Sequence, residues 1–197
     1  MKVTIDKNAG FCWGVVRTID IAEGSLVDKS KVYCLGDVIH NTLEVERLNR
    51  LGLSTITVDE IPNLEKGSRV LIRAHGEPPS TYKLAAQYGV ELVDATCPIV
   101  IKVQERVRKF VDKGFQVVIF GKKNHAEVVG INGVTGNTSI VVLNKEEALG
   151  SVDFTKPTVL FSQTTMDKQE FKEVAEALRQ KLETLVIGSM EEEAVQY

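Results

Sequence analysis

The sequence has few cysteines, no long apolar run and no excess of positive charge. Its 197 residues carry a formal net charge of −3, so we expect no nucleic-acid partner, because such proteins carry basic patches or stripes. No apolar run approaches the roughly 18 residues that a membrane-spanning helix needs. The N-terminal "MKVTIDKN" also lacks the apolar segment of a signal peptide. We therefore expect a cytoplasmic protein without a membrane partner.

The three cysteines are too few, and odd in number, for a disulfide framework in a reducing compartment. Cys34 lies inside a strand-like run and is expected to be a small core residue. Cys12 and Cys97 lie instead where a strand gives way to a helix, and the free N–H groups of a helix start favour a thiolate. Gly10 and Gly14 flank Cys12 and would let the backbone approach a bulky group closely.

Short β-branched runs alternate with amphipathic segments along the whole chain. This alternation predicts the α/β class, with two βα-repeat lobes that each contain a parallel sheet. A division near "VDATCP" gives lobes 1–96 and 97–197. Strands are expected at 3–5, 31–36, 54–58, 69–74, 90–95, 115–121, 139–143 and 158–162, and helices at 14–27, 42–52, 78–89, 98–114, 145–150 and 167–183.

The chemically active side chains share one position in this pattern, just after an expected strand. In open parallel sheets the carboxyl ends of the strands form the edge at which ligands bind. Each residue also has a simpler interpretation, since a single histidine in a loop is usually a surface or capping residue. We nevertheless expect these side chains to face one cavity: Cys12, His40, His75, Cys97, His125 and Thr164.

Three kinds of site could use such a set of thiols and imidazoles. A structural zinc site usually shows C-x₂₋₄-C spacing, which the sequence lacks. A cysteine–histidine nucleophile pair would need one cysteine and leave the second cysteine and the other histidines without a role. An iron–sulfur cluster held by well-separated cysteines, beside an anion pocket of histidines, uses all of them.

Several motifs occur together in an order that is specific as a set. They are "GFCWGV", "HN" with "EVERL", "AHGEPPSTY", "DATCPIV", "NHAEVVG" and "SQTT". From about Val3 to about Leu182, the chain thereby resembles the LytB/IspH family, the 4-hydroxy-3-methylbut-2-enyl diphosphate reductases of non-mevalonate isoprenoid biosynthesis. The resemblance implies a trefoil of three α/β domains around a 4Fe-4S cluster. It also implies reductive removal of the substrate hydroxyl as water, giving isopentenyl and dimethylallyl diphosphate.

The resemblance assigns a role to each candidate residue. Cys12 and Cys97 match two of the family's three cluster ligands. Glu127 matches the acid that relays protons, and Thr164 matches the threonine beside the substrate hydroxyl. The imidazoles of the diphosphate pocket match His40, His75 and His125. An external donor such as ferredoxin or flavodoxin would supply electrons, because no G-x-G-x-x-G fingerprint of a nicotinamide or flavin site is present.

The sequence departs from the family pattern at two places. The third cluster cysteine and the third domain, against which residues 1–13 would pack, have no match, since the sequence after "LVIGSM" is "EEEAVQY". Trp13 is larger than the family's residue beside the cysteine and would crowd a cluster. We therefore expect little turnover from these residues alone. The alternative is a cluster-free α/β module that binds a phosphorylated metabolite or a partner protein.

Overall fold

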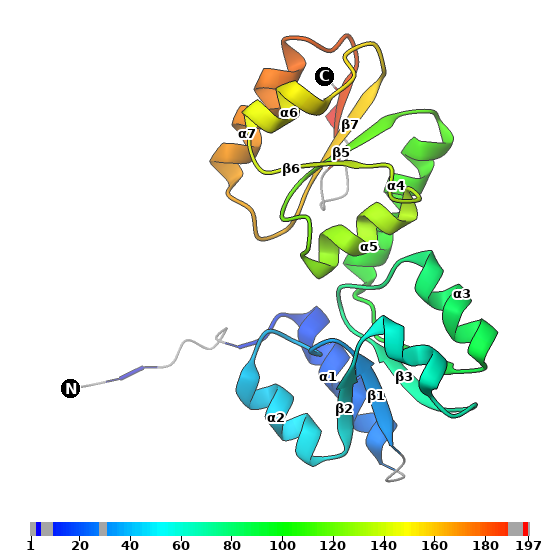
Figure 1. The fold of residues 1–197 in the computed structure, drawn as a ribbon. Coiled ribbons are helices and arrows are strands. Elements are labelled where there is room, and N and C mark those ends of the chain that lie inside the picture. The colour runs from blue at the N-terminus through cyan, green and yellow to red at the C-terminus, as the bar shows by residue number, and fades with distance from the viewer. Residues whose placement is uncertain (1–2, 5–9, 28–30, 189–194, 197) are drawn as a thin grey trace. The chain divides into compact units, whose positions relative to one another are not determined.

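The computed structural model describes residues 3–4, 10–27, 31–188 and 195–196. By its internal contacts the chain divides into two compact units (Figure 1). The first comprises residues 1–74 with 84–98, and the second comprises 75–83 with 99–197. None of the helices in the described part of the chain has the length and apolar character needed to cross a bilayer.

The first unit is built on a four-stranded parallel sheet of order β2-β1-β3-β4. Its crossovers are helices, as short parallel strands require. The strands are β1 (Val32–Leu35), β2 (Leu53–Ile56), β3 (Arg69–Ile72) and β4 (Glu91–Asp94), and the helices are α1 (Trp13–Leu26), α2 (Thr42–Arg50), the 3₁₀ helix η1 (Val58–Asn63) and α3 (Pro79–Tyr88). Helix α3 is divided, since residues 79–83 belong to the second unit and 84–88 to the first.

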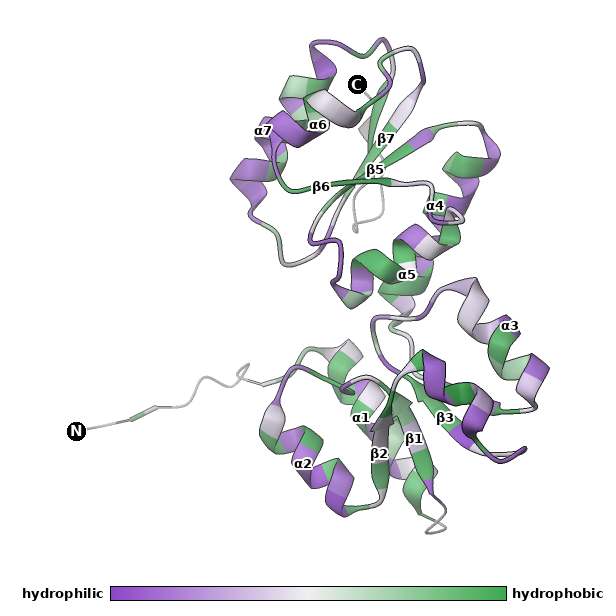
Figure 2. Ribbon diagram, viewed as in Figure 1, coloured by the Kyte–Doolittle hydropathy of each residue, from purple (hydrophilic) through white to green (hydrophobic). Residues whose placement is uncertain are grey.

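Two apolar layers cover this sheet, because successive side chains of a strand point to opposite faces. Leu71 packs in one layer with Ile19 and Leu26 of α1, whereas Val70 and Ile72 pack in the other. Apart from Arg69 at the start of β3, the central strands are therefore mostly apolar, as expected for a parallel sheet covered on both faces (Figure 2).

The second unit contains a five-stranded sheet of order β6-β5-β7-β8-β9. The first four strands are parallel, and β9 pairs with β8 in the antiparallel direction. The strands are β5 (Gln116–Phe120), β6 (Ile140–Val142), β7 (Thr158–Ser162), β8 (Leu185–Gly188) and β9 (Val195–Gln196), and the helices are α4 (Pro98–Asp112), α5 (Ala126–Val134), α6 (Lys145–Ser151) and α7 (Lys168–Arg179). Buried side chains of α4 and α5 pack on one face of the sheet, and those of α6 and α7 pack on the other.

The predicted α/β class with two sheets of parallel strands is confirmed. The starts of two helices, the end of one of them and the burial of Cys34 also agree with the residue types at these positions. Pro98 is the first residue of α4, and Gly114 follows the end of that helix with φ of +79°, a conformation that glycine adopts easily. Asp167 caps α7, because its side chain accepts the N–H groups of Gln169 and Glu170. Cys34 is fully buried in the core of the first unit.

Five elements differ from the sequence-based expectation. Helix α5 was not predicted, because "AEVVGINGV" contains two glycines and has no clear polar face. The short strands β8 and β9 and the 3₁₀ helix η1 were also missed. A strand was predicted at 3–5, but Val3 and Thr4 form none, and residue 5 lies outside the described residues.

Candidate functional site

The strand order of the second unit places its candidate residues at a topological switch point. The chain leaves β5 toward β6 on one side, and β7 lies on the other side of β5. Ligands of open α/β sheets bind at the carboxyl ends of two neighbouring strands whose connections lead to opposite sides, as here. The segment after β5 contains His125 and Glu127, and the segment after β7 contains Thr164.

Glu127 and Thr164 form a two-point hydrogen-bonded pair across this switch point. The backbone N–H of Thr164 donates to Oε1 of Glu127 at 3.0 Å, and its hydroxyl donates to Oε2 at 2.6 Å. Glu127 is buried, with 3% of its surface exposed, whereas Thr164 is exposed. A buried carboxyl group is thus linked through one hydroxyl to the surface of the unit, which is the arrangement that a proton relay requires.

His125 has a structural role in addition to its predicted role in binding. It is the N-cap of α5, and its Nδ1 accepts the backbone N–H of Glu127 at 3.3 Å. A neutral ring whose Nδ1 accepts a hydrogen bond carries its proton on Nε2. The imidazole therefore has a donor at Nε2, next to the free N–H groups of a helix start.

His75 is brought next to His125 within the second unit. The two ring centroids are 5.7 Å apart, and the ring planes are nearly perpendicular at 87°. The two imidazoles therefore meet edge to face beside the start of α5. Of the sequence-predicted residues, this unit thus brings together His75, His125, Glu127 and Thr164.

Gln163 is a member of this site that sequence reasoning missed. Its side chain is 2% exposed, and it links the segments that follow β5 and β7. Its Oε1 accepts the N–H of Lys122 at 3.0 Å, and its Nε2 donates to the hydroxyl of Thr165 at 2.6 Å. The signal was present in "SQTT", where a polar residue directly follows an apolar strand.

The first unit places its two candidate cysteines at the start of α1. Cys12 is the N-cap of this helix and is exposed. A Cβ atom built on Gly14 would lie 2.8 Å from the Sγ of Cys97, so this thiol packs directly against the first turn. Since two residues of chain span at most about 7 Å, both cysteines lie near the same helix start. Trp13, the first residue of α1, is 64% exposed and leaves this helix start uncovered by the core.

Hydrogen bonds from α1 hold the segment before Cys97 in place. Arg17 donates from Nη1 to the carbonyl oxygens of Ala95 and Thr96, at 3.2 and 3.1 Å. The buried hydroxyl of Thr18 donates to the same Ala95 oxygen at 3.2 Å. Sequence reasoning missed both residues, because their partners are nearly 80 positions away.

His40 also belongs to the first unit. It is exposed and follows β1, directly before Asn41, whose side chain caps α2 by accepting the N–H of Glu44 at 3.1 Å. Because β1 and β3 flank the switch point of this sheet, His40 lies at its ligand-binding edge.

These residues suit a cluster in chemical type. Two thiols at a helix start, one of them exposed, can bind iron, and the helix N–H groups favour the negative charge of the cluster and its ligands. The third cysteine, Cys34, is buried among apolar side chains of the core and is not placed to contribute.

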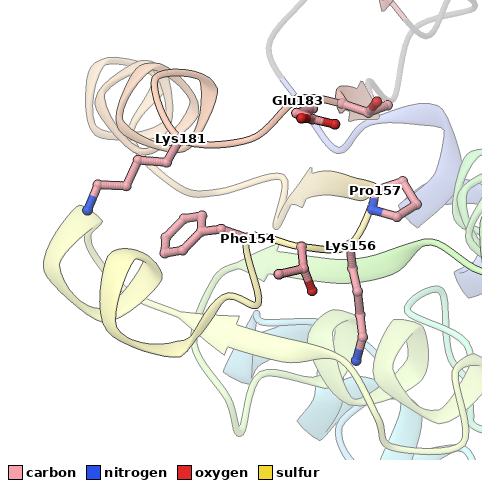
Figure 3. Close-up of a pocket in the computed structure, with 7 residues that line it drawn as sticks. Phe154, Lys156, Pro157, Lys181 and Glu183 are labelled. Carbon is pink, nitrogen blue, oxygen red and sulfur yellow. The ribbon is translucent and has the colours of Figure 1, made fainter.

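A surface pocket in the second unit lies away from these residues (Figure 3). It is found at the amino ends of β7 and β8, whereas the candidate residues follow the carboxyl ends of β5 and β7. The ammonium group of Lys181 lies 5.4 Å from the centre of the Phe154 ring at this pocket. The lining residues are Phe154, Thr155, Lys156, Pro157, Lys181, Glu183 and Thr184.

The turn at this pocket contains a carboxyl group with a depressed pKa. The hydroxyl and N–H of Thr155, together with Lys156, lower the pKa of Asp153 to about 2 from 3.8. Since the folded-state pKa is lowered, Asp153 stabilises the fold above pH 3.8 and loses this effect as the pH falls toward about 2. We expect Thr155→Ala to raise this pKa, measured by NMR titration of the carboxyl carbon. Titration of Asp153 near 3.8 in the unaltered protein would contradict the assignment.

Comparison with known proteins gives consistent matches over both units. A family model described as "LytB protein" matches residues 3–193. The chain is 50% identical over 178 residues to the 4-hydroxy-3-methylbut-2-enyl diphosphate reductase of Chloroherpeton thalassium, covering 88% of this chain and 56% of that protein. It is 46% identical over 188 residues to the reductase of the same name from Porphyromonas gingivalis, covering 93% and 64%.

Two solved structures are similar to this fold. One is described as (E)-4-hydroxy-3-methyl-but-2-enyl diphosphate reductase, the terminal enzyme of the non-mevalonate pathway. It matches with a TM-score of 0.82 and 35% identity over 95% of this chain and 67% of that chain. The other, the E-1-hydroxy-2-methyl-but-2-enyl-4-diphosphate reductase of Plasmodium falciparum, has a TM-score of 0.82 and 26% identity, over 90% and 57%. The chain spans only 56% and 64% of the two curated relatives.

Proposed function

Since the chain belongs to the LytB protein family, we propose that it is part of a 4-hydroxy-3-methylbut-2-enyl diphosphate reductase. The observation that carries this proposal is the Glu127–Thr164 pair, which lies at the switch point of the second sheet, on the segments that also hold His125. The names of the curated relatives favour this activity over the alternative of a cluster-free binding module.

In this proposal the imidazoles and the helix start bind the diphosphate of the substrate. A neutral His125 would donate from Nε2, because its Nδ1 is used to cap α5. His75, whose ring meets that of His125, would contact the same anion, and the start of α5 would add its N–H groups and dipole. His40 would supply a third imidazole from the first unit.

Glu127 and Thr164 would move the proton that the leaving hydroxyl needs. The substrate hydroxyl would bind beside the exposed Thr164 oxygen. For this transfer Glu127 would first take up a proton on Oε2, and the Thr164 hydroxyl, which donates to Oε2 in the structure, would turn toward the substrate. The proton on Oε2 would then pass to the Thr164 oxygen while the Thr164 hydroxyl proton passes to the departing oxygen, which leaves as water. Burial of Glu127 keeps bulk water away from its carboxyl group.

Cys12 and Cys97 would hold a 4Fe-4S cluster together with a third ligand. When bound, such a cluster would supply the two electrons and a Lewis-acidic iron. A third α/β domain, in the portion of the relatives that this chain does not span, would supply the remaining cysteine and further diphosphate ligands. An external donor such as ferredoxin or flavodoxin would deliver the two electrons in the cytoplasm. A second proton would then add to the allylic carbon skeleton, so that the products would be isopentenyl and dimethylallyl diphosphate.

Binding of inorganic diphosphate, measured by calorimetry, tests the anion pocket. We expect His125→Ala to weaken binding by about tenfold to a hundredfold, because one hydrogen bond to a charged group is worth about 1.5–3 kcal/mol. His125→Asn should keep the helix cap but also lose affinity, since it lacks the Nε2 donor.

The matched control for this experiment is Asn144→Ala. Asn144 caps α6 in the same unit, where its side chain accepts the N–H of Glu147 at 2.8 Å. This variant loses a cap without losing an imidazole, so its affinity for diphosphate should equal that of the unaltered protein. Equal affinity in His125→Ala would remove His125 from the pocket.

A further inference from the structure

Helix α5 contains two glycines that no chemical role explains. Gly130 and Gly133 lie three positions apart, so they share one face of the helix. Glycine is among the poorest helix formers, and this helix has only nine residues. Contacts outside the helix must therefore help to stabilise it, and in the structure both glycines lie in close contact with the segment that begins at His75.

Gly133 is the tighter of the two contacts. A Cβ atom built at this position would lie 2.4 Å from Cβ, 2.9 Å from Cγ and 3.0 Å from Cα of Pro78. Carbon atoms in favourable contact are about 3.5–4.0 Å apart, so any side chain here would displace Pro78 by about an ångström. The absent side chain of Gly133 is what lets the proline ring reach the helix.

Gly130 makes a milder contact of the same kind. A Cβ atom there would lie 3.3 Å from the carbonyl oxygen of His75 and 3.2 Å from Nε2 of Gln104. The backbone of His75 itself therefore lies against α5. A side chain at position 130 would therefore displace this segment only slightly, whereas a side chain at position 133 would displace it much further.

The segment between these contacts is anchored at several points, so a displacement at Pro78 reaches His75. Pro78 and Pro79 are consecutive prolines with fixed φ angles. Glu77 is 8% exposed, and its carboxylate accepts the hydroxyl of Thr81 at 3.3 Å. Gly76, at φ of +72°, lies between Pro78 and His75, so a shift of Pro78 is transmitted by the burial of Glu77, its bond to Thr81 and the contact of the His75 carbonyl with Gly130.

We propose that Gly133, assisted by Gly130, is a positioning residue that seats the His75–Pro78 segment on α5 and so sets the His75 imidazole against that of His125. One helix then holds both rings: His125 is its N-cap, and His75 is held through the glycine contacts. This inference deepens the proposed diphosphate pocket and rests on it for its functional consequence.

The test is Gly133→Ala, with two independent measurements. The ring signals of His75 in NMR spectra should shift, because the ring current of a neighbouring imidazole depends on their mutual geometry. Affinity for inorganic diphosphate should fall by at least about tenfold, the effect of losing one charged hydrogen bond. Gly130→Ala should show both effects at a smaller size.

Gly150→Ala is the matched control, because Gly150 also lies in a helix of this unit and nothing lies within 4 Å of an added Cβ. It should change neither measurement. The double variant Gly133→Ala/Pro78→Gly adds a methyl group to the helix and removes the proline ring that it would meet. It should therefore restore the His75 signals toward those of the unaltered protein. Pro78→Gly alone leaves α5 intact and should shift the same signals, which keeps the test valid if Gly133→Ala fails to fold.

Unchanged His75 signals in Gly133→Ala, or in Pro78→Gly, would overturn the positioning role. Failure of the unaltered protein to bind diphosphate would instead contradict the proposed pocket, while the NMR comparison would still decide whether Gly133 positions His75.

Discussion

Cys97→Ser is expected to eliminate the visible charge-transfer absorbance and most of the iron of anaerobically reconstituted protein. The Sγ of Cys97 packs against Gly14 in the first turn of α1, the helix that Cys12 caps. A serine hydroxyl remains protonated at neutral pH and is a poor iron ligand, so only one thiol would remain at this helix start. Iron and sulfide analysis, together with absorbance spectra, measures the loss.

Cys34→Ser is the matched control for this prediction. Cys34 is fully buried on β1, so its replacement should leave the absorbance in place. It should lower the free energy of unfolding by about 1–3 kcal/mol, because a hydroxyl replaces an apolar thiol in the core. Iron content equal to that of the unaltered protein in Cys97→Ser, or its loss in Cys34→Ser alone, would refute the assignment.

Glu127→Gln is expected to reduce the rate of reductive turnover by about 10² to 10⁴, the usual contribution of a positioned acid. The amide keeps the size of the side chain and one acceptor for Thr164, but it cannot hold the proton that the carboxyl group would supply. The rate is measured with reconstituted protein, 4-hydroxy-3-methylbut-2-enyl diphosphate and reduced methyl viologen, by chromatography of the products over hours.

Two comparisons separate a chemical role of Glu127 from a structural one. The affinity of Glu127→Gln for inorganic diphosphate should not change, because the group of residue 127 that donates to His125 Nδ1 is the backbone N–H, which the substitution keeps. Glu147→Gln, at an exposed helix start in the same unit, should affect neither rate nor affinity. A turnover rate of Glu127→Gln within a factor of about three of the unaltered protein, far below the usual effect, would exclude Glu127 as the proton donor.

The fold class, and the sheet edge at which most of the candidate residues lie, were predictable from the sequence. Alternation of strands and helices specifies parallel crossovers, and the candidate residues other than Cys12 lie in segments that follow a strand. The partner of each residue was not predictable. Glu127 and Thr164 are 37 positions apart, and their bond exists because β7 pairs with β5, an order that alternation alone leaves open.

Two residue roles depend on contacts that no local pattern encodes. Cys34 was expected in the core, but strand alternation left open the face of the sheet that it takes, and its packing with side chains of α1 and α2 decides that face. The glycines of α5 obscured the helix in sequence analysis, because glycine lowers helix propensity. The contact that explains them is visible only in the fold, where Pro78, 55 positions earlier in the chain, lies against Gly133.

The division of the chain into units has a consequence for how the molecule can be dissected. Residues 75–83 belong to the second unit although residues 84–98, which follow them, return to the first. A fragment that begins at residue 99 would therefore retain His125 but lack His75, and it would lack Pro78, which packs against Gly133. No single cut of the chain therefore separates the two units completely. A fragment that keeps both His75 and His125 must contain residues 75–83 as well as the residues from 99 onward.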